Sequence, residues 1–253
     1  MVEELSEYAK KSQKSAKSSW KEDGSIVTNV DLEISETIRR EIAKLFPDDN
    51  VVTEEELTEW KPDAKWNFIL DPIDGTEVFY SGLPSFCTAL GILDGKLNPV
   101  GAFIAAPRFG IGEEKLILSY IPGEDIYING ERIDDFSKDD GLEEIMISSR
   151  LSGFDYSSFH GKVRSIGSSV LQIITPALVR RIKGSVTLPC YAWDLAAAIA
   201  VANHASLVSK YPDGSTFRFT FDMVRERKKA QDVIYTAKEN EVDNLMKACR
   251  KIQ

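Results

Sequence analysis

The sequence predicts a mixed α/β (α+β) fold, and three observations carry this prediction. Apolar residues recur at helical intervals over residues 32–46. Four β-prone segments follow one another over residues 66–120, with short breaks between them. Beyond about residue 140, shorter strand-like segments alternate with helical ones. The succession of strands favours an antiparallel sheet in the first half of the chain.

The first half should contain two helices and then the strands. Residues 2–20 are polar and lysine-rich, which is typical of a solvated helix, and residues 32–46 are amphipathic until Pro47 ends the helix. Val51-Val52-Thr53 is a short β-prone segment. The expected strands are residues 66–70, 86–93, 99–105, 115–120 and 126–129, with a hairpin turn at Asp94-Gly95.

A polar stretch at residues 137–141 separates the two patterns and marks the expected domain boundary. We expect an N-terminal α+β half over residues 1–139 and a C-terminal α/β half over residues 140–253. The second half should contain helices at residues 168–183 and 193–203.

The composition excludes several classes of function. A net charge of −9 over 253 residues argues against a nucleic-acid or anionic-membrane partner, since either needs a basic face. No apolar run reaches the roughly 18 residues of a membrane span and no signal peptide is recognisable, so a cytoplasmic location is expected. Cys87, Cys190 and Cys249 lack metal or redox spacing and should be reduced. The chain has only two histidines, His160 and His204, which argues against a histidine-rich zinc site.

The hexapeptide of residues 71–76, Asp-Pro-Ile-Asp-Gly-Thr, follows an apolar strand and is the best candidate for a metal site. Pro72 fixes one φ angle and Gly75 permits a left-handed turn, so Asp71, Asp74 and the Thr76 hydroxyl can be directed towards one point. Mg²⁺ prefers a few carboxylate oxygens together with phosphate and water. An aspartate-rich β-turn without a metal is an equal alternative when the hexapeptide is taken alone.

Further carboxylates flank this segment at a distance in the sequence. Glu54 and Glu55 follow a β-prone segment, and Asp194 opens a helix of small residues. Each has an ordinary explanation, because glutamate runs mark solvated surfaces and an aspartate caps a helix N-terminus. Together with Asp71 and Asp74 they supply the acids that a two-metal phosphoryl-transfer site needs.

In these motifs the chain resembles the inositol monophosphatase superfamily of Mg²⁺-dependent, lithium-sensitive phosphatases. The matching segments are residues 21–31, which fit Lys-x₅-Val-Thr-x-x-Asp, then Glu54-Glu55, residues 71–76, and Trp-Asp-Leu-Ala-Ala at residues 193–197. Their order and spacing match over nearly the whole chain. The resemblance implies a layered α-β-α-β-α sandwich with the metal site between the two halves, and a homodimer.

The resemblance also implies a role for each acid. Glu54, Asp71 and the main-chain carbonyl of Ile73 would hold a first metal, while Asp71, Asp74 and Asp194 would hold a second. The cofactor would be two or three Mg²⁺ ions, with Mn²⁺ as a substitute. A metal lowers the pKa of a water that it binds, which makes the water a usable nucleophile.

Thr76 and Asp31 would form the relay that orients that water and takes its proton, and Glu55 would assist through a second water. The backbone N–H groups of Gly75 and Thr76 would bind the phosphate, beside Asp74. Asp31 has an alternative as a helix cap with Thr28, and the two roles are compatible. Lys21 is either a solvated lysine or a residue near the phosphate or a third metal. Placing the glutamate pair one residue later, to include Glu56, is also open.

The substrate is the least determined feature. A family loop of the form Arg-x-x-Gly-Ser-small is found at Arg164 to Ser169, where Arg164, Ser168 and Ser169 would contact the sugar or a second phosphate, together with Arg180. The alternative is a helix cap by Ser168 and a surface arginine. Thr187 replaces a glutamate that binds inositol hydroxyls, and residues 203–206 depart from a Glu-Ala-Gly-Gly turn.

These departures favour the short prokaryotic-type members, which act on inositol 1-phosphate and fructose 1,6-bisphosphate. The expected function is hydrolysis of such sugar or polyol phosphates by metal-activated water. An alternative substrate is the nucleotide 3′-phosphoadenosine 5′-phosphate. A remote alternative is a non-catalytic metal-binding module with the same fold.

Overall fold

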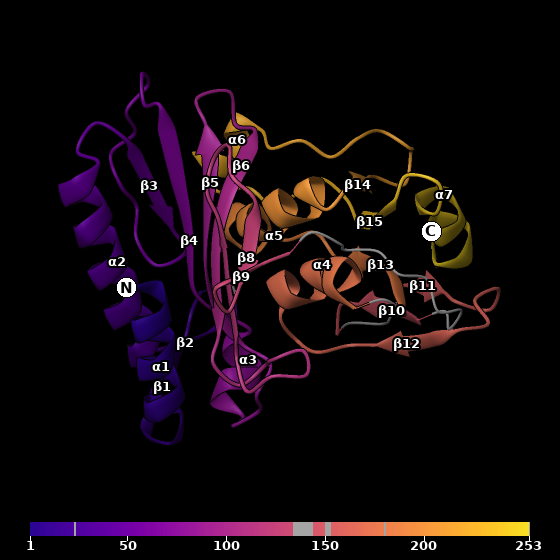
Figure 1. Cartoon of the computed structure of the whole chain (residues 1–253), viewed down its shortest axis with the longest axis horizontal. Helices are drawn as coiled ribbons and strands as arrows, with labels where there is room; N and C mark the ends of the chain where they lie inside the picture. Colours follow the sequence, from indigo (N-terminus) through magenta and orange to yellow (C-terminus); the bar gives the residue numbers. More distant parts are fainter. Residues whose placement is uncertain (23, 134–143, 150–152, 180, 253) are drawn as a thin grey trace.

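The computed structural model describes residues 1–22, 24–133, 144–149, 153–179 and 181–252. Its elements form five layers, which run from left to right in Figure 1. Helices α1 and α2 cover a seven-stranded sheet, α4 and α5 fill the middle, and a five-stranded sheet and α7 complete the order. This arrangement confirms the expected α-β-α-β-α sandwich.

The helical elements are α1 (Val2–Ser12), the 3₁₀ turn η1 (Gln13–Ser15), α2 (Asn29–Leu45), α3 (Thr76–Tyr80), α4 (Ser169–Leu178), α5 (Ala192–His204), α6 (Phe221–Val224) and α7 (Val242–Ala248). Among the described residues, none of these helices combines the length and the apolar composition that crossing a membrane requires.

The seven-stranded sheet has the order β3-β4-β5-β6-β7-β8-β9. Its strands are β3 (Asn50–Thr53), β4 (Trp66–Asp74), β5 (Cys87–Asp94), β6 (Pro99–Ala106), β7 (Leu116–Tyr120), β8 (Ile126–Ile128) and β9 (Glu131–Arg132). Neighbours are antiparallel, as predicted, except that β3 joins β4 in parallel. A parallel neighbour needs a crossover connection, and here residues 54–65 return the chain from the end of β3 to the start of β4.

Alternation along the strands separates two apolar cores. Phe68, Leu70 and Leu90 face α2, where they pack with Ile34 and Ile38. The opposite face of the sheet contributes another set of side chains to the core formed with α4 and α5, including Ile69, Ala89 and Leu93. The seven-stranded sheet is therefore apolar on both faces, as its position inside the sandwich requires.

Helix α5 lies unusually close to the sheet at Gly91. A Cβ atom at this position would lie 2.5 Å from the Cβ of Ala196 and 2.6 Å from the backbone nitrogen of Ala197. The run of alanines in α5 provides the complementary flat surface, since small side chains allow backbones to approach. Glycine in β5 and alanines in α5 thus fix the spacing between these two layers.

The five-stranded sheet has the order β12-β10-β13-β15-β14. Its strands are β10 (Glu144–Ile147), β12 (Lys162–Arg164), β13 (Ile182–Thr187), β14 (Leu207–Lys210) and β15 (Ile234–Lys238). The first three pair in parallel and the last two antiparallel. Residues such as Ile145, Val186 and Tyr235 pack with α7 in a third core.

Two predicted helices are shorter than expected. The helix predicted over residues 2–20 ends at Ser12, and β1 (Ser18–Trp20) pairs with β2 (Ile26–Thr28) as a small antiparallel ribbon. The apolar contacts of this segment become sparse after Ala9, so pairing with β2 satisfies the backbone better than further helix does. The helix predicted over residues 168–183 ends at Leu178, and its last residues belong to β13. Two further pairs of residues, in β11 (Phe154–Asp155) and β16 (Arg250–Lys251), form a separate two-stranded ribbon.

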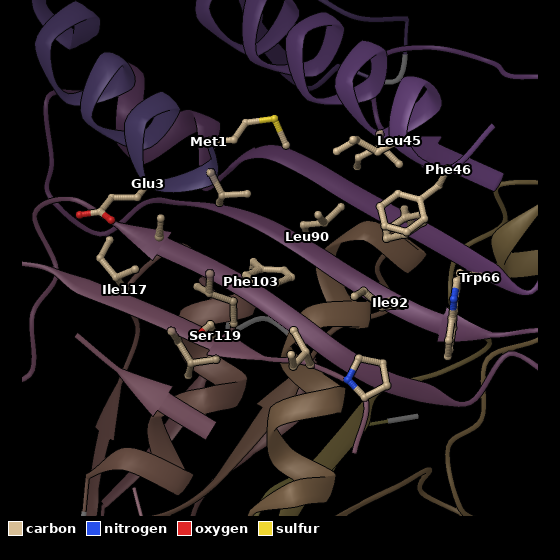
Figure 2. A pocket seen from close by; sticks show the side chains of 18 residues that line it. Met1, Glu3, Leu45, Phe46, Trp66, Leu90, Ile92, Phe103, Ile117 and Ser119 are labelled. Carbon is tan, nitrogen blue, oxygen red and sulfur yellow. The ribbon is translucent and has the colours of Figure 1, made fainter. Parts of the chain in front are cut away.

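An apolar hollow of about 640 Å³ lies on the face of the seven-stranded sheet that carries α1 and α2. Figure 2 shows Leu45, Phe46, Trp66, Leu90 and Phe103 around it. Because Leu90 and Gly91 point to opposite faces of β5, this hollow and α5 lie on opposite sides of the sheet. The hollow is therefore separate from the acidic residues described next.

Candidate active site

The parallel pairing of β3 and β4 brings the glutamate pair to the aspartate motif. Thr53 pairs with Leu70, and the backbone N–H of Glu54 donates to the Leu70 carbonyl over 3.3 Å. In a parallel pair the carboxyl ends of both strands meet at one edge of the sheet. Glu54, directly after β3, therefore lies beside Asp71 of β4, although Thr53 and its strand partner Leu70 are 17 residues apart in the sequence.

The aspartate motif continues β4 instead of forming a loop after it. The pairing with β5 passes from Asp71–Ala89 to Asp74–Cys87 across a bulge. Pro72 has no N–H to donate, so the ladder is interrupted there and resumes at Asp74. The strand expected to end at Leu70 therefore continues for four more residues, to Asp74. The turn itself comes at Gly75, whose φ of +90° is the left-handed value that glycine tolerates best.

Asp194 reaches the same point from the opposite layer. It is the third residue of α5, and one oxygen accepts a 2.8 Å hydrogen bond from the Tyr191 N–H at the start of the helix. Each of Asp71, Asp74 and Asp194 offers a carboxylate oxygen, and these oxygens lie within 4.8 Å of one another. The close contact of α5 with the sheet is what allows this approach.

Burial raises the pKa of every acid in this cluster, and repulsion from the neighbouring carboxylates adds to the effect. The pKa is about 6 for Asp74, about 7 for Asp194 and about 8 for Glu54, while that of Asp71 lies well above its usual range. A raised pKa means that a carboxylate holds its proton more readily, so these four acids bind protons when no cation is present to offset their charge. The cluster would be stabilised by any added positive charge.

The donor set fits a hard divalent cation. Asp71 Oδ1 is fully buried and has no hydrogen-bond partner among the described residues. Such an atom carries a desolvation cost that a ligand to oxygen would remove. The donors are all carboxylate oxygens, the type that Mg²⁺ and Ca²⁺ prefer over nitrogen or sulfur. Asp71, Asp74 and Asp194 could therefore hold a metal ion.

Asp74 also joins the seven-stranded sheet to helix α4. Its carboxylate accepts hydrogen bonds from the Ser168 hydroxyl, from the Ser169 N–H over 3.1 Å and from the Val170 N–H over 2.9 Å. These donors belong to the first turn of α4, whose N-terminus favours negative charge. Ser168 caps α4 as well, donated to by the Leu171 N–H. The cap and the contact with Asp74, given above as alternatives, thus coexist.

Asp31 and Thr76 lie at hydrogen-bond distance from each other. Asp31 Oδ2 accepts from the backbone N–H and the hydroxyl of Thr28 in a capping box at the start of α2. The Thr76 hydroxyl is 3.2 Å from Asp31 Oδ1 and 2.9 Å from the Ile73 carbonyl. Burial raises the pKa of Asp31 to about 6, despite these hydrogen bonds. Capping leaves Oδ1 available to the site.

Lys21 pairs with both glutamates. Its ammonium is 2.6 Å from Glu54 Oε1 and 2.8 Å from Glu55 Oε1. Burial alone would lower the pKa of Lys21, but attraction to Glu54 and hydrogen bonds to both carboxylates raise it. Lys21 is therefore part of the acidic site, and the simple solvated lysine of the sequence interpretation was wrong. Glu56 points elsewhere and pairs with Arg39.

The residues predicted to bind substrate do not all lie at the acidic cluster. Arg164 forms a two-pronged ion pair with Glu144 of the neighbouring strand, and no described contact joins it to the acidic cluster. Its loop nevertheless packs on the motif, because a Cβ at Gly75 would lie 3.3 Å from the Gly167 carbonyl. Thr187 is buried and accepts from Gln172 over 3.1 Å. Arg180 lies outside the described residues.

Sequence reasoning missed an aromatic and basic group beside the cluster. Arg227 donates to the main-chain carbonyl of Glu54 and lies over the Trp193 ring at 4.9 Å. Lys229 lies over Tyr191 at the same distance, and the two rings stack with centroids 4.5 Å apart. The only signal was the basic run of residues 225–229, which 173 residues separate from Glu54.

Comparison with known proteins identifies the same family that the sequence motifs resemble. The model of the inositol monophosphatase family matches residues 1–252. A fructose-1,6-bisphosphatase/inositol-1-monophosphatase of Thermotoga maritima is 34% identical over 191 residues, which cover 71% of this chain and 69% of the relative.

Solved structures show the same fold. A Thermotoga maritima IMPase superposes with a TM-score of 0.78 at 24% identity, over 98% of this chain and 92% of the other. An IMPase/NADP phosphatase complexed with Mg²⁺ and phosphate superposes with a TM-score of 0.76 at 19% identity, over 99% and 94%. With the family model spanning nearly every residue, this chain belongs to the inositol monophosphatase family and is a phosphatase.

Proposed function

We propose that the protein is a Mg²⁺-dependent phosphatase that hydrolyses sugar or polyol phosphate monoesters, namely inositol 1-phosphate, fructose 1,6-bisphosphate or both. The observation that carries the proposal is the triad of Asp71, Asp74 and Asp194, in which the first two are buried and one oxygen of Asp71 has no partner among the described residues. The name of the Thermotoga maritima relative supports the two substrates.

Five groups would hold two or three Mg²⁺ ions, with Mn²⁺ as a substitute. They are the carboxylates of Glu54, Asp71, Asp74 and Asp194 and the main-chain carbonyl of Ile73. When bound, the metal supplies positive charge that activates water and stabilises the transferring phosphoryl group. The buried acids have the raised pKa values expected of a site that binds cations in place of protons.

The remaining residues would act on the water and the phosphate. Thr76 can hold the attacking water by its hydroxyl and pass a proton to Asp31 Oδ1, which lies 3.2 Å away. Asp31 keeps its position because Thr28 holds the other oxygen. Glu55, buried beside Lys21, would orient a second water. The N–H groups of Gly75 and Thr76 precede the first full turn of α3, so they are available to phosphate oxygens.

The test is a phosphate-release screen with inositol 1-phosphate and fructose 1,6-bisphosphate, with and without Mg²⁺. Asp71→Asn and Asp194→Asn should lose more activity than the roughly 10–100-fold typical of a residue that only supports a metal ligand. Asp63→Asn, an exposed aspartate, is the matched control and should retain activity. Normal phosphate release by either cluster variant would reject the proposal. Calorimetric Mg²⁺ binding without turnover on any substrate would instead favour a non-catalytic module.

A nucleotide substrate, 3′-phosphoadenosine 5′-phosphate, is the second candidate. One structural relative is named an IMPase/NADP phosphatase, which supports a nucleotide substrate. Phosphate release from this nucleotide, with none from fructose 1,6-bisphosphate, would favour it.

Four wider features complete the proposal. We expect a homodimer, which light scattering can measure. We expect inhibition by lithium, since a staphylococcal relative has been solved in a LiCl inhibitory complex. We also expect a cytoplasmic location, which cell fractionation can test. The two halves, residues 1–139 and 140–253, would be the structural units, and limited proteolysis near their junction should leave two protected fragments.

A further inference from the structure

The segment between α6 and β15 carries four cations that differ in their partners. Arg225 and Lys228 pair with acids of their own segment, Glu226 at 3.6 Å and Asp222 at 2.6 Å. Arg227 and Lys229 have no carboxylate within ion-pair distance in the part of the chain that the structure describes. Two of the four cations thus have a carboxylate partner, while Arg227 and Lys229 have none among the described residues.

Arg227 and Lys229 both lie over the stacked rings of Trp193 and Tyr191, beside the acidic cluster. Arg227 has a φ of +54°, an uncommon value for a residue with a side chain, and this conformation carries its guanidinium back to the Trp193 ring. Lys229 lies 4.9 Å above Tyr191. A ring face attracts a cation but does not cancel its charge, so both groups can still bind an anion.

A pocket of about 260 Å³ opens between this group and the candidate metal ligands. Its lining is Lys21, Glu22, Glu54, Tyr191, Trp193 and Arg227. Glu54 belongs to the acidic site, and Trp193 directly precedes Asp194. Lys21 is held by Glu54 and Glu55, so Arg227 is the cation of this lining that remains for a ligand.

Two cations at this pocket suit phosphate, because Arg227 lines it and Lys229 lies over Tyr191, which also lines it. One N–H of Arg227 is used by the Glu54 carbonyl, and a guanidinium has five in a fixed planar array, which suits two-pronged binding of phosphate oxygens. Lys229 adds a mobile point charge next to it. An anion approaching a chain of net charge −9 also needs such a local positive patch.

We propose that Arg227 and Lys229 form a subsite for a second phosphate group of the substrate, distinct from the phosphate that is hydrolysed at the acidic cluster. The subsite would select bisphosphorylated substrates over monophosphates of similar size. This inference rests on the proposed function for its setting. The second phosphate could belong to a sugar bisphosphate or to a nucleotide, because both present the same group to the two cations.

The first test is kinetic. Lys229→Gln and Arg227→Gln should each lower the ratio of kcat/KM for fructose 1,6-bisphosphate to kcat/KM for inositol 1-phosphate about tenfold, mainly through KM, and the double variant more. The matched controls Arg225→Gln and Lys228→Gln should leave the ratio unchanged. If Arg227 only holds the Glu54 segment in place, its variant will lower activity on both substrates equally. An equal loss for Lys229→Gln as well would overturn the subsite.

The second test does not depend on turnover. Calorimetric Kd values are measured with Ca²⁺ for fructose 1,6-bisphosphate, 3′-phosphoadenosine 5′-phosphate and inositol 1-phosphate. The Lys229→Gln variant should bind the first, the second or both about tenfold more weakly, with a smaller change for inositol 1-phosphate. The affected compound identifies the source of the second phosphate. Absence of turnover with this selective loss would reject the proposed function alone; equal affinities in wild type and variant would reject the subsite.

Discussion

Lys21 donates a 2.6 Å hydrogen bond to Glu54, so an ammonium lies against a carboxylate that is expected to bind metal. The pair joins the ribbon of β1 and β2 to the end of β3, and Glu55 accepts from the same ammonium. Without a divalent ion, Lys21 is the nearest source of positive charge for these two glutamates. Lys21 should therefore contribute more to the stability of the metal-free protein than to that of the metal-bound protein.

Lys21→Gln should destabilise the metal-free protein and increase its response to Mg²⁺. Glu54 and Glu55 would lose their cation, and at pH 8 the melting temperature should fall by about 3 °C or more. The gain on adding Mg²⁺ should exceed that of the wild type. Differential scanning fluorimetry with EDTA or Mg²⁺ measures both quantities. Lys17→Gln, at an exposed position, serves as control, and an identical Mg²⁺ gain in all three proteins would contradict the expectation.

Thr76→Val should lower kcat about a hundredfold or more, because the hydroxyl between Asp31 and the Ile73 carbonyl would be lost. The shape of the side chain is nearly kept, so KM should change much less. Thr76→Ser restores the hydroxyl and should recover most of the activity. Steady-state kinetics on the best substrate separate the two parameters. A Thr76→Val enzyme as active as Thr76→Ser would remove Thr76 from the proton path.

The metal-free protein should lose stability as the pH rises from 5 to 8. Unfolded carboxyl groups titrate near pH 4, whereas burial raises the pKa of Asp74 to about 6, of Asp194 to about 7 and of Glu54 to about 8. The folded state therefore binds more protons than the unfolded state over this window, and its stability is lost as the pH passes through the folded pKa values.

Melting temperatures in EDTA across this pH range test the expectation, and Mg²⁺ should restore stability most strongly at pH 8. Asp71→Asn removes one acid from the cluster and should flatten the pH dependence. A melting temperature in EDTA that rises with pH would show that the acids are not buried together as the structure has them.

Gly91→Ala should destabilise the fold by about 3 kcal/mol, at or beyond the upper end of ordinary overpacking. The added methyl group would lie 2.5 Å from the Ala196 Cβ and must push α5 from the sheet. Gly95→Ala is the comparison, since its methyl group would meet nothing closer than 3.3 Å. Urea unfolding measures the difference. Equal stabilities would show that the two layers can separate without cost.

The sequence predicted the acids and most strands because both depend on local pattern. Rigid turn chemistry marks residues 71–76, and alternation marks strands such as β5 and β6. The pairing of β3 with β4, which brings Glu54 to Asp71, is a long-range event that no local signal encodes. The helix predicted through Trp20 was wrong because the ribbon with β2 satisfies its backbone.

The contacts around Asp74 and Arg227 were beyond prediction for a similar reason. Asp74 contacts the start of α4, about 95 residues later in the sequence. Arg227 contacts Glu54, which lies 173 residues earlier. Both contacts exist only once the two sheets are packed on the middle helices. Residue type at these positions indicates chemistry, while tertiary packing decides the partner.

The hydrogen bonds from α4 to Asp74 also give the site an intrinsic reporter. The amide groups of Ser169 and Val170 donate to the carboxylate that is expected to bind metal, so withdrawal of electron density from that carboxylate must alter both amide protons. Their NMR shifts and their rates of exchange with solvent should follow metal occupancy. Occupancy of the acidic cluster can thus be observed at the first turn of α4, without a chromophore and without turnover.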